Sequence, residues 1–297
     1  MNTWGVSLRQ LRLFVVAARH PSLAAASRRL NVSQATLSEA IRDLEGVLGR
    51  RLFDRDGRRL RLNALGHGFL VDAEHLVMEA DDLVRRHGVK RQLTIGASVT
   101  IGNYILSDVL IALRRLQPEL GISVVIRNTE TIAKAVAARE VNVALVEGAI
   151  RNSDLEVRPW RNDALVVIAA QGHPVARGAT VKDLMKADWI LREVGSGTRE
   201  SFDSVTRDWP QPARVAMTVG GNELLKALVR DGAGLGCLSA AAVVDEARRG
   251  ELSIVPTGPF VMGRILRIVT PMGRRPDDAV SAFLSVCEQS RDITPPA

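Results

Sequence analysis

The sequence has few cysteines and no long apolar segment, and these absences narrow the class of protein. Its two cysteines, Cys237 and Cys287, each lie in an apolar run, and no Cys-x-x-Cys or Cys/His cluster is present. This argues against a disulfide framework and a zinc site, and favours two buried, reduced thiols over a redox-sensing pair. No run approaches the roughly 18 apolar residues that a membrane span needs.

A leader segment is also not indicated. Residues 1–5 contain no basic stretch that leads into an apolar one, as a secretory signal would. We therefore expect a soluble, cytoplasmic protein. Its 297 residues, 46% of them hydrophobic, are sufficient for two or three domains with sizeable cores.

The five histidines give no indication of an enzyme. Four of them (His20, His67, His75 and His87) are scattered through the first third of the chain, and His173 lies in a Gly-His-Pro turn. None accompanies a Ser or Cys nucleophile motif or a metal-ligand spacing. The sequence thus predicts no catalytic residue, no metal and no cofactor, and an active site assembled from distant residues is the alternative.

The positive charge is concentrated at one end of the chain. Residues 1–62 contain twelve arginines, no lysine and five acidic residues, a net charge of +7 that equals the charge of the whole chain. Residues 63–297 are therefore neutral. A basic segment on a neutral protein is typical of a polyanion binder, although a solvated basic face is the alternative.

Residues 1–62 predict three helices and a hairpin. Apolar residues at intervals of three and four predict helices over 7–19, 23–30 and 34–48, which begin after Ser7, Ser22 and Ser33, and Gly49 ends the third. Two short alternating runs then flank Asp56-Gly57, a strong turn signal. Three helices and a basic hairpin predict a winged helix-turn-helix.

Residues 63–90 predict a linker helix. Phe69, Ala73, Leu76, Ala80 and Leu83 follow a heptad spacing for about two repeats. We expect this helix to join two copies of the chain, because readers of DNA half-sites usually work in pairs. An amphipathic helix packed on its own protein is the alternative.

From residue 91 onward, strand-like runs alternate with helical ones, which predicts an α/β domain with mostly parallel strands. The expected strands are 93–97, 122–126, 143–146, 164–169, 189–191, 215–219, 234–238 and 265–270. The expected helices include 103–116, 132–138, 200–207, 223–230 and 277–289. This length suits two lobes, the first over about 91–160 and 265–297 and the second over about 161–264, with crossovers near 158–163 and 258–264.

The first domain resembles the LysR-type transcriptional regulators. The resemblance covers residues 14–55 and rests on spaced positions such as Ala24-Ala25-Ala26, Ser33-Gln34 and the ending Leu-Glu…Leu-Gly…Leu-Phe-x-Arg. It implies a winged helix-turn-helix, a linker helix and a two-lobed effector domain similar to periplasmic binding proteins. The family usually has Thr in place of Asn63 and often Pro in place of Ser107, and Asn caps a helix as well as Thr does.

DNA contacts are expected at the start of the third helix and on the wing. In a helix-turn-helix the recognition helix places its first turns on base edges, where Gln can pair with adenine and a methyl group can touch thymine. Basic side chains further along the helix and on the wing suit phosphates or the minor groove. The predicted DNA-binding residues are Ser33, Gln34, Ala35, Thr36, Ser38, Arg42, Arg55, Arg58 and Arg59.

The α/β part carries a candidate anion site. The run Gly195-Ser196-Gly197-Thr198-Arg199 precedes a helix and combines free backbone N–H groups, hydroxyls and a positive charge. A plain loop with a helix cap is the alternative. The resemblance adds positions after other strands and implies that effectors bind there. The predicted effector-binding residues are Ser98, Thr100, Ile101, Thr129, Gly195, Ser196, Gly197, Thr198, Arg199 and Asn222.

These features predict a regulator that binds double-stranded promoter DNA at an interrupted palindrome and responds to a small anionic effector, as a dimer or tetramer. The anion loop, together with Leu145–Gly148 and Asn222–Lys226, looks most like the branch that regulates carbon fixation and sulfur assimilation. The alternatives are a cytoplasmic anion-binding protein with a basic accessory domain, an enzyme fused to a DNA-binding domain, and an architectural protein indifferent to sequence. The effector, the target genes and the choice between activation and repression stay open.

Overall fold

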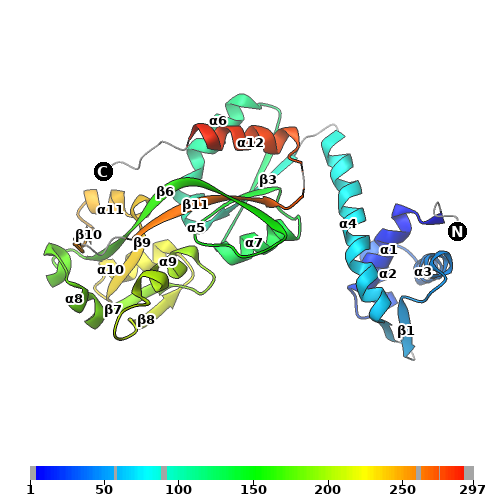
Figure 1. Ribbon diagram of the computed structural model, residues 1–297, viewed down its shortest axis with the longest axis horizontal. Coiled ribbons are helices and arrows are strands. Elements are labelled where there is room, and N and C mark those ends of the chain that lie inside the picture. Colours follow the sequence, from blue (N-terminus) through cyan, green and yellow to red (C-terminus); the bar gives the residue numbers. More distant parts are fainter. Residues whose placement is uncertain (1–4, 57–58, 88–91, 259–261, 274, 291–297) are drawn as a thin grey trace. The chain divides into compact units, whose positions relative to one another are not determined.

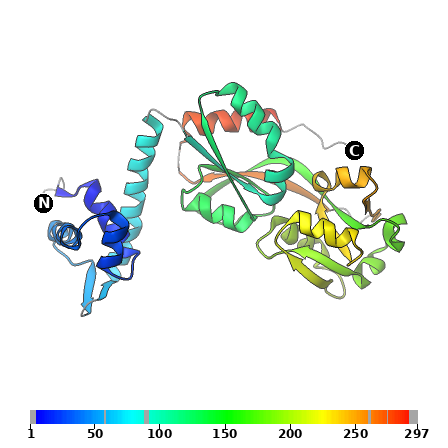
Figure 2. The same cartoon turned by 180° about the vertical axis from the view of Figure 1, so that it is seen from behind.

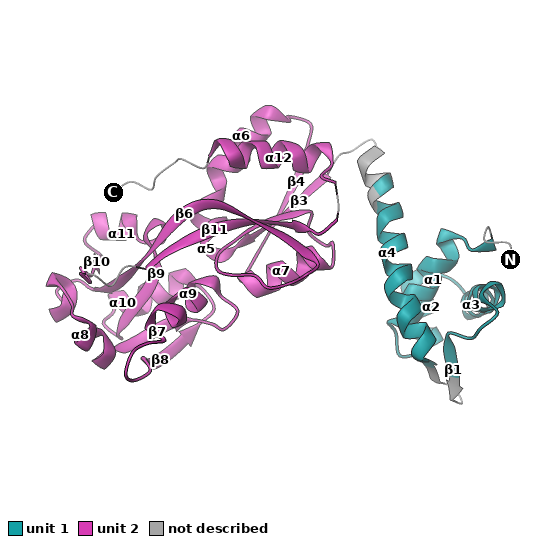
Figure 3. Ribbon diagram, viewed as in Figure 1, with its two compact units in different colours: residues 1–89 teal, residues 90–297 magenta. Residues whose placement is uncertain are grey.

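The computed structural model describes residues 5–56, 59–87, 92–258, 262–273 and 275–290. The chain forms two compact units, residues 1–89 and residues 90–297 (Figure 3). We describe each unit by itself.

The first unit begins with three helices that start where the sequence predicts. Each helix begins after a serine whose side chain accepts a backbone N–H three residues later, which satisfies one of the free donors of the first turn. Asn31 (φ 54°) and Gly49 (φ 65°) end the second and third helices in the left-handed region. The helices are α1 (Leu8–Ala18), α2 (Leu23–Leu30) and α3 (Gln34–Leu48).

A hairpin and a long helix complete this unit. Strands β1 (Phe53–Asp56) and β2 (Arg59–Leu62) pair antiparallel, and α4 spans Ala64–His87. Phe14 of α1 lies at the centre of the core, with ring centroids 5.5 Å from Phe53 and 5.2 Å from Phe69. The hairpin and α4 are therefore both anchored on α1.

The predicted heptad seam of α4 is divided between two environments. Phe69 and Ala73 pack in the core of their own unit, and Ala73 is only 1% exposed. Leu76 and Leu83 are 52% and 56% exposed. The seam therefore packs within its own unit at Phe69 and Ala73, where α1 and α4 are in contact, and is exposed at Leu76 and Leu83.

The second unit is built on one sheet that runs through both lobes, in the order β4-β3-β5-β11-β6-β9-β7-β8 with β10 paired to β6 (Figure 1). Its strands are β3 (Gln92–Ser98), β4 (Gly121–Arg127), β5 (Val143–Val146), β6 (Leu155–Ala170), β7 (Asp188–Arg192), β8 (Arg214–Val219), β9 (Leu235–Ser239), β10 (Leu252–Ile254) and β11 (Met262–Pro271). Its helices are α5 (Val99–Tyr104), α6 (Leu106–Leu116), α7 (Thr129–Ala137), α8 (Val181–Lys186), α9 (Gly197–Thr206), α10 (Asn222–Arg230), α11 (Val244–Arg248) and α12 (Asp278–Gln289), with 3-10 turns at Pro174–Arg177 and Ala240–Ala242.

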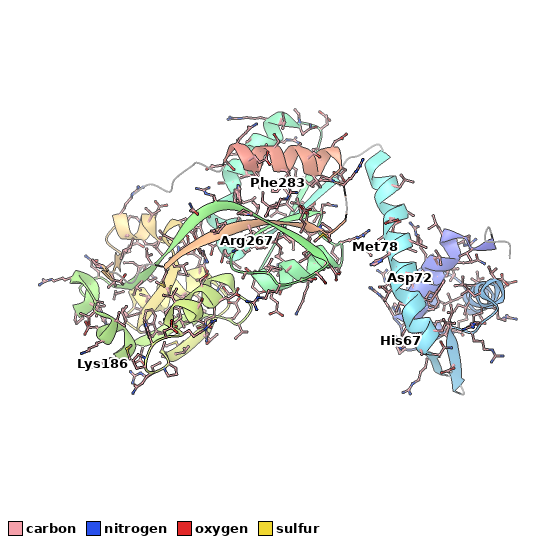
Figure 4. All side chains as sticks on the ribbon, viewed as in Figure 1. His67, Asp72, Met78, Lys186, Arg267 and Phe283 are labelled. Carbon is pink, nitrogen blue, oxygen red and sulfur yellow. The ribbon has the colours of Figure 1, made fainter. Side chains whose placement is uncertain are left out.

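Lobe I contains β3, β4 and β5, and helices cover both faces of its part of the sheet. Helices α6 and α12 pack on one face through a shared apolar core, and α7 packs on the other (Figure 2). Phe283 of α12 is fully buried in the first of these cores, under the helix in Figure 4. Lobe II repeats this plan around β7, β8 and β9, with α10 on one face and α8 and α9 on the other.

Strands β6 and β11 join the lobes. They pair antiparallel from Leu155–Pro271 to Leu165–Met262. The predicted crossover near 158–163 is therefore part of the continuous strand β6. Of the predicted crossover near 258–264, residues 262–264 begin β11, and residues 259–261 lie outside the described residues. The prediction of mostly parallel strands holds within each lobe, where β3 pairs parallel with β4 and β5, and β7 with β8 and β9. It is wrong at the centre, where β11 and β6 run antiparallel to each other and to their outer neighbours.

Candidate functional sites

The first candidate site is the start of α3. Ser33 caps this helix by accepting the backbone N–H of Thr36 at 3.0 Å, and its hydroxyl lies 2.8 Å from the Thr36 hydroxyl. Gln34, Ala35 and Arg42 are exposed, whereas Leu37, Ile41 and Leu44 of the same helix are buried. The helix therefore presents a polar, uncharged first turn to solvent, with Arg42 two turns further along.

The wing is fixed relative to this helix by a residue that the sequence analysis did not single out. A carboxylate oxygen of Glu45 accepts the backbone N–H groups of Leu52 (2.8 Å) and Phe53 (3.2 Å) at the start of the hairpin. Of the predicted wing residues, Arg58 lies outside the described residues, and only the backbone of Arg55 and Arg59 is described. They stay predictions.

The second candidate site is a buried polar cluster between the two lobes. Glu147, which follows β5 in lobe I, is 2% exposed and accepts hydrogen bonds from Ser98 (2.9 Å) and from Thr198 of lobe II (3.0 Å). The guanidinium of Arg264 on β11 lies 3.1 Å from the same carboxylate and 3.0 Å from Thr198. Two of the predicted effector-binding hydroxyls are therefore bonded to a carboxylate of the chain itself.

Arg264 also holds a second buried carboxylate. Its Nε lies 2.6 Å from Asp163 of β6, whose other oxygen accepts the hydroxyl of Ser239 at 2.7 Å. Arg264 Nη2 is buried and has no hydrogen-bond partner among the described residues. Two carboxylates around one guanidinium give this cluster a formal charge of −1 when all three groups are ionised.

The environment sets the protonation state of Glu147. Burial by itself favours the neutral acid and raises its pKa, but the charge of Arg264 and the hydrogen bonds from Thr100, Ser98 and Thr198 favour the carboxylate. The net effect lowers the pKa of Glu147 below its ordinary value. At neutral pH the cluster therefore contains an ionised carboxylate.

Asn222 connects the lobes beside this cluster. Its Nδ2 lies 3.4 Å from Thr100 Oγ1 of lobe I, and its Oδ1 accepts Arg192 Nη1 at 2.5 Å. Arg192, at the end of β7, is 1% exposed and is paired with Glu193 at 2.8 Å. A buried charge of this kind needs such partners, and here they fix Asn222 toward lobe I.

A pocket of about 470 Å³ opens next to the buried cluster, between α7 of lobe I and α9 of lobe II. Thr129, the first residue of α7, is 5% exposed, and its hydroxyl oxygen has no hydrogen-bond partner among the described residues. The backbone N–H of Glu130 donates to the carbonyl of Gly195 at 3.1 Å, which brings the two helix N-termini together. The pocket is lined by Thr129, Glu130, Ala133, Lys134, Ala149, Ile150, Arg151, Asn152, Val194, Gly195, Ser196, Arg199, Glu200, Asp203 and Arg207.

The charged groups of the pocket fall into paired and unpaired sets. Lys134 bonds Glu130 at 2.6 Å, and Arg199 bonds Asp203 at 2.9 Å and the carbonyl of Arg192 at 3.2 Å. Within the described residues, Arg151, Arg207 and Glu200 have no ion-pair partner. Positive charge therefore remains on the rim, while the predicted cation Arg199 is already engaged.

Eight of the ten predicted effector-binding residues fall into two groups, and Gly197 and Ile101 lie apart from both. Ser98, Thr100, Thr198 and Asn222 belong to the buried cluster, whereas Thr129, Gly195, Ser196 and Arg199 line the pocket. Gly197 separates the two sites, because a side chain there would collide with the backbone of Glu147. Ile101 is different, since it is fully buried in the core of lobe I and presents no side chain to either site.

The sequence analysis missed the charged members of this region: Glu147, Asp163, Arg192 and Arg264. One signal was available for Glu147, a charged residue directly after the buried run Val143–Val146. Asp163 and Arg264 lie in strands that pair only in the folded chain, with Arg264 opposite Asp163 in the register of β6 and β11. No spacing in the sequence indicates that pair.

The described residues contain no group of three or more His, Cys, Asp or Glu side chains that could hold a metal ion. Within the same residues, no helix is both long and apolar enough to cross a membrane.

Comparison with known families matches both units. Residues 8–67 match the model of the bacterial regulatory helix-turn-helix protein, lysR family, and residues 86–292 match the LysR substrate binding domain. The HTH-type transcriptional regulator YeiE of Escherichia coli (strain K12) is 36% identical over 95% of this chain and 97% of its own. The RuBisCO operon transcriptional regulator of Allochromatium vinosum is 30% identical over 94% of each chain.

Solved structures show the same architecture. The regulatory domain of CcmR from Synechocystis PCC6803, in complex with 2-PG, superposes with a TM-score of 0.64 at 26% identity over 69% of this chain and 99% of that one. Full-length CbnR in complex with its target DNA has a TM-score of 0.64 at 20% identity and covers 96% of this chain and 100% of that one. The expectations of a winged helix-turn-helix and of a two-lobed α/β effector domain are confirmed, and the chain belongs to the LysR family of bacterial transcriptional regulators.

Proposed function

We propose that this LysR-family regulator binds an interrupted palindrome in promoter DNA as a dimer held through α4, within a tetramer, and that a small anion bound between its lobes controls it. The start of α3 supports the DNA part, because its first turn is exposed and polar while its apolar residues are buried. The exposed Leu76 and Leu83 support the dimer, since two such side chains on one long helix favour burial against a second copy.

Thr129 is the observation that carries the anion proposal. Its hydroxyl is buried with no hydrogen-bond partner among the described residues, at the N-terminus of α7, where the helix dipole favours negative charge. The N-terminus of α9 with its cap Ser196, whose side chain makes no capping hydrogen bond, lies on the same pocket. Arg151 and Arg207, which have no ion-pair partner in the part of the chain that the structure describes, add positive charge at the rim.

The hydroxyls of Ser98 and Thr198 are not available to an anion, because both donate hydrogen bonds to Glu147. An anion on Ser98 and Thr198 would meet the Glu147 carboxylate and be repelled. The pocket beside Thr129 is therefore the favoured position, and its volume of about 470 Å³ suits a small organic molecule. The CcmR regulatory domain was solved with 2-PG, which makes 2-PG the first probe, with sulfate and phosphate beside it.

The test is the binding of these three anions to the full chain, measured by calorimetry and thermal shift. Thr129→Val removes one hydroxyl and should weaken binding of the anion that stabilises the parent, whereas Thr131→Val, an exposed position on the same helix, should leave it unchanged. Arg151→Gln and Arg207→Gln should also weaken binding. Equal affinity of the parent and Thr129→Val for that anion would remove Thr129 from the site.

Protection of a defined sequence upstream of the chain's own gene or its neighbours tests the DNA part. Affinity for an anion without any preferred DNA sequence would favour the alternative of an anion-binding protein with a basic accessory domain. Family membership supports the remaining inferences, that the protein acts in the cytoplasm, where promoters are, and that it regulates transcription rather than catalysing a reaction.

A further inference from the structure

Tyr104, the only tyrosine of the chain, contacts both lobes. It lies on α5, one helical turn after Thr100 of the buried cluster. Its side chain packs against the apolar core of lobe I and against the core of lobe II that contains α10. Its hydroxyl donates a hydrogen bond of 2.5 Å to Glu223, in the first turn of α10. One side chain thus makes both an apolar and a polar contact across the lobe boundary.

Lys226 fixes the lobe II side of this contact. It is 6% exposed, and its Nζ lies 2.9 Å from Glu223, 2.6 Å from Glu246 of α11, and 3.1 Å from the carbonyl of Ala242. The same ammonium lies 5.2 Å from the centroid of the Tyr104 ring, within range of a cation–π contact. Three partners within lobe II hold the ammonium, so the ring and the hydroxyl of Tyr104 dock on a preorganised surface.

The contact lies next to the buried cluster along both helices. Thr100 and Tyr104 are one turn apart on α5, and Asn222 directly precedes Glu223 on α10. The hydrogen bonds from Asn222 to Thr100 and from Tyr104 to Glu223 therefore both join α5 to α10, one helical turn apart on α5. Separating α5 from α10 would break both bonds, while β6 and β11 would keep the lobes connected.

We propose that Tyr104, Glu223 and Lys226 form a latch between the lobes that stabilises their closed arrangement and so positions Thr100 and Asn222. The proposal rests on the proposed function, in which the effector binds between the lobes. The three are positioning residues, because they act through Asn222 and α5 and do not line the pocket. A weaker latch lowers the population of the closed state, and the apparent affinity for an effector that binds this state falls by the same factor.

Two substitutions isolate the hydrogen bond. Tyr104→Phe keeps the ring and removes the hydroxyl that donates, and Glu223→Met keeps the length of the side chain and removes the oxygen that accepts. Arg230→Gln is the matched control, since Arg230 is exposed on the same helix and, within the described residues, forms an ion pair only with Asp231. Each latch variant alone is expected to increase opening about tenfold, as for loss of a hydrogen bond to a charged group.

The experiment is amide hydrogen exchange of the full chain without effector or DNA, so its result does not depend on the identity of the effector. Both latch variants should exchange faster in α5 and in the first turn of α10, on opposite lobes, with β3 and β9 unchanged. The double variant should exchange no faster than the Glu223 variant alone, because Tyr104→Phe removes no bond that the Glu223 substitution leaves. Arg230→Gln should match the parent.

Faster exchange confined to α10, faster exchange throughout the unit, or additive effects in the double variant would overturn the latch. For any anion that binds the parent, Tyr104→Phe should also lower affinity, by at most the tenfold change in opening, while Thr131→Val does not. If the exchange pattern appears and none of the three anions binds, the latch stands and the anion proposal fails.

Discussion

Glu147 and Arg264 form an ion pair across 3.1 Å in which both side chains are almost fully buried, at 2% and 4% exposure. The pair joins the end of β5 to the strand β11 that continues into lobe II, and Thr198 of lobe II bonds both partners. The charge on Glu147 therefore holds lobe I, the connecting strand and the N-terminus of α9 together. Arg267, labelled in Figure 4, adds a hydrogen bond from the same strand to the carbonyl of Gly148.

Arg264→Met should strongly destabilise the effector unit. The substitution leaves the carboxylates of Glu147 and Asp163 buried without their cation, and breaking a buried pair from one side costs about 3–5 kcal/mol. Urea unfolding monitored by tryptophan fluorescence measures the loss. Arg161→Met, on the neighbouring strand and half-buried, is the control. An equal loss of unfolding free energy in both variants would show that the Glu147–Arg264 pair contributes no more to stability than Arg161 does.

Stability should fall at acid pH through Glu147. Its pKa in the folded chain lies below the ordinary value of 4.5, so it binds a proton more weakly than in the unfolded chain. The resulting stabilisation is fully present above about pH 4.5 and is lost as the pH falls through the lower folded pKa. Glu147→Gln should flatten this acid limb of a melting-temperature profile and leave the profile between pH 6 and pH 8 parallel to that of the parent. If the acid limb is unchanged in Glu147→Gln, the loss of stability at acid pH comes from other carboxylates.

The local chemistry of the DNA-binding unit could be predicted because its signals are close together in the sequence. Ser7, Ser22 and Ser33 each cap a helix that starts at the next residue, and Asn63, where the family usually has Thr, accepts the N–H of Gly66 at 2.8 Å. Such caps need only three residues. Their prediction does not depend on tertiary structure.

The effector region could be predicted only in part, for the opposite reason. The sequence shows the anion loop 195–199 as glycines and hydroxyls before a helix, but the carboxylate that Thr198 bonds belongs to Glu147, which follows β5 and is 51 residues away. Likewise, the sequence predicts that Arg199 is a free cation, whereas in the structure it forms an ion pair with Asp203. Burial and pairing decide which donors remain available, and neither is a property of a local pattern.

Gly66→Ala should disrupt the junction between the wing and α4. A Cβ at Gly66 would collide with the carbonyl oxygen of Leu52. Because that oxygen belongs to the backbone, it cannot move aside as a side chain would. Gly68, two residues further on the same helix, has open space around it, so Gly68→Ala should stabilise by up to about 1 kcal/mol through helix propensity. Melting temperature and operator affinity should fall in the first variant only. Similar behaviour of the two variants would contradict the tight packing at Leu52.

Gln34→Ala should reduce discrimination between operator and random DNA. A good base contact contributes about 1–3 kcal/mol to specificity, which corresponds to a loss of roughly 5- to 150-fold. Arg42→Gln is the contrasting variant, because a phosphate contact weakens binding to both DNAs equally and lowers the salt slope by about 1. Competition binding at two or more salt concentrations separates the two effects. An unchanged specificity ratio in Gln34→Ala would exclude this residue from base reading.

Tyr104 provides a spectroscopic test of its own surroundings, since a chain with a single tyrosine gives one phenolate titration. Burial and then the hydrogen bond to Glu223 raise its pKa to about 12, against the opposing charge of Lys226. Because the pKa in the folded chain exceeds the ordinary tyrosine pKa of 10.0, this contribution to stability is fully present below pH 10 and is lost as the pH rises through about 12. Absorbance after rapid pH jumps, recorded before unfolding, should give a lower midpoint for Glu223→Gln than for the parent, and Arg230→Gln should retain the parent's midpoint. Equal midpoints for the parent and Glu223→Gln would mean that the carboxylate does not hold the phenol.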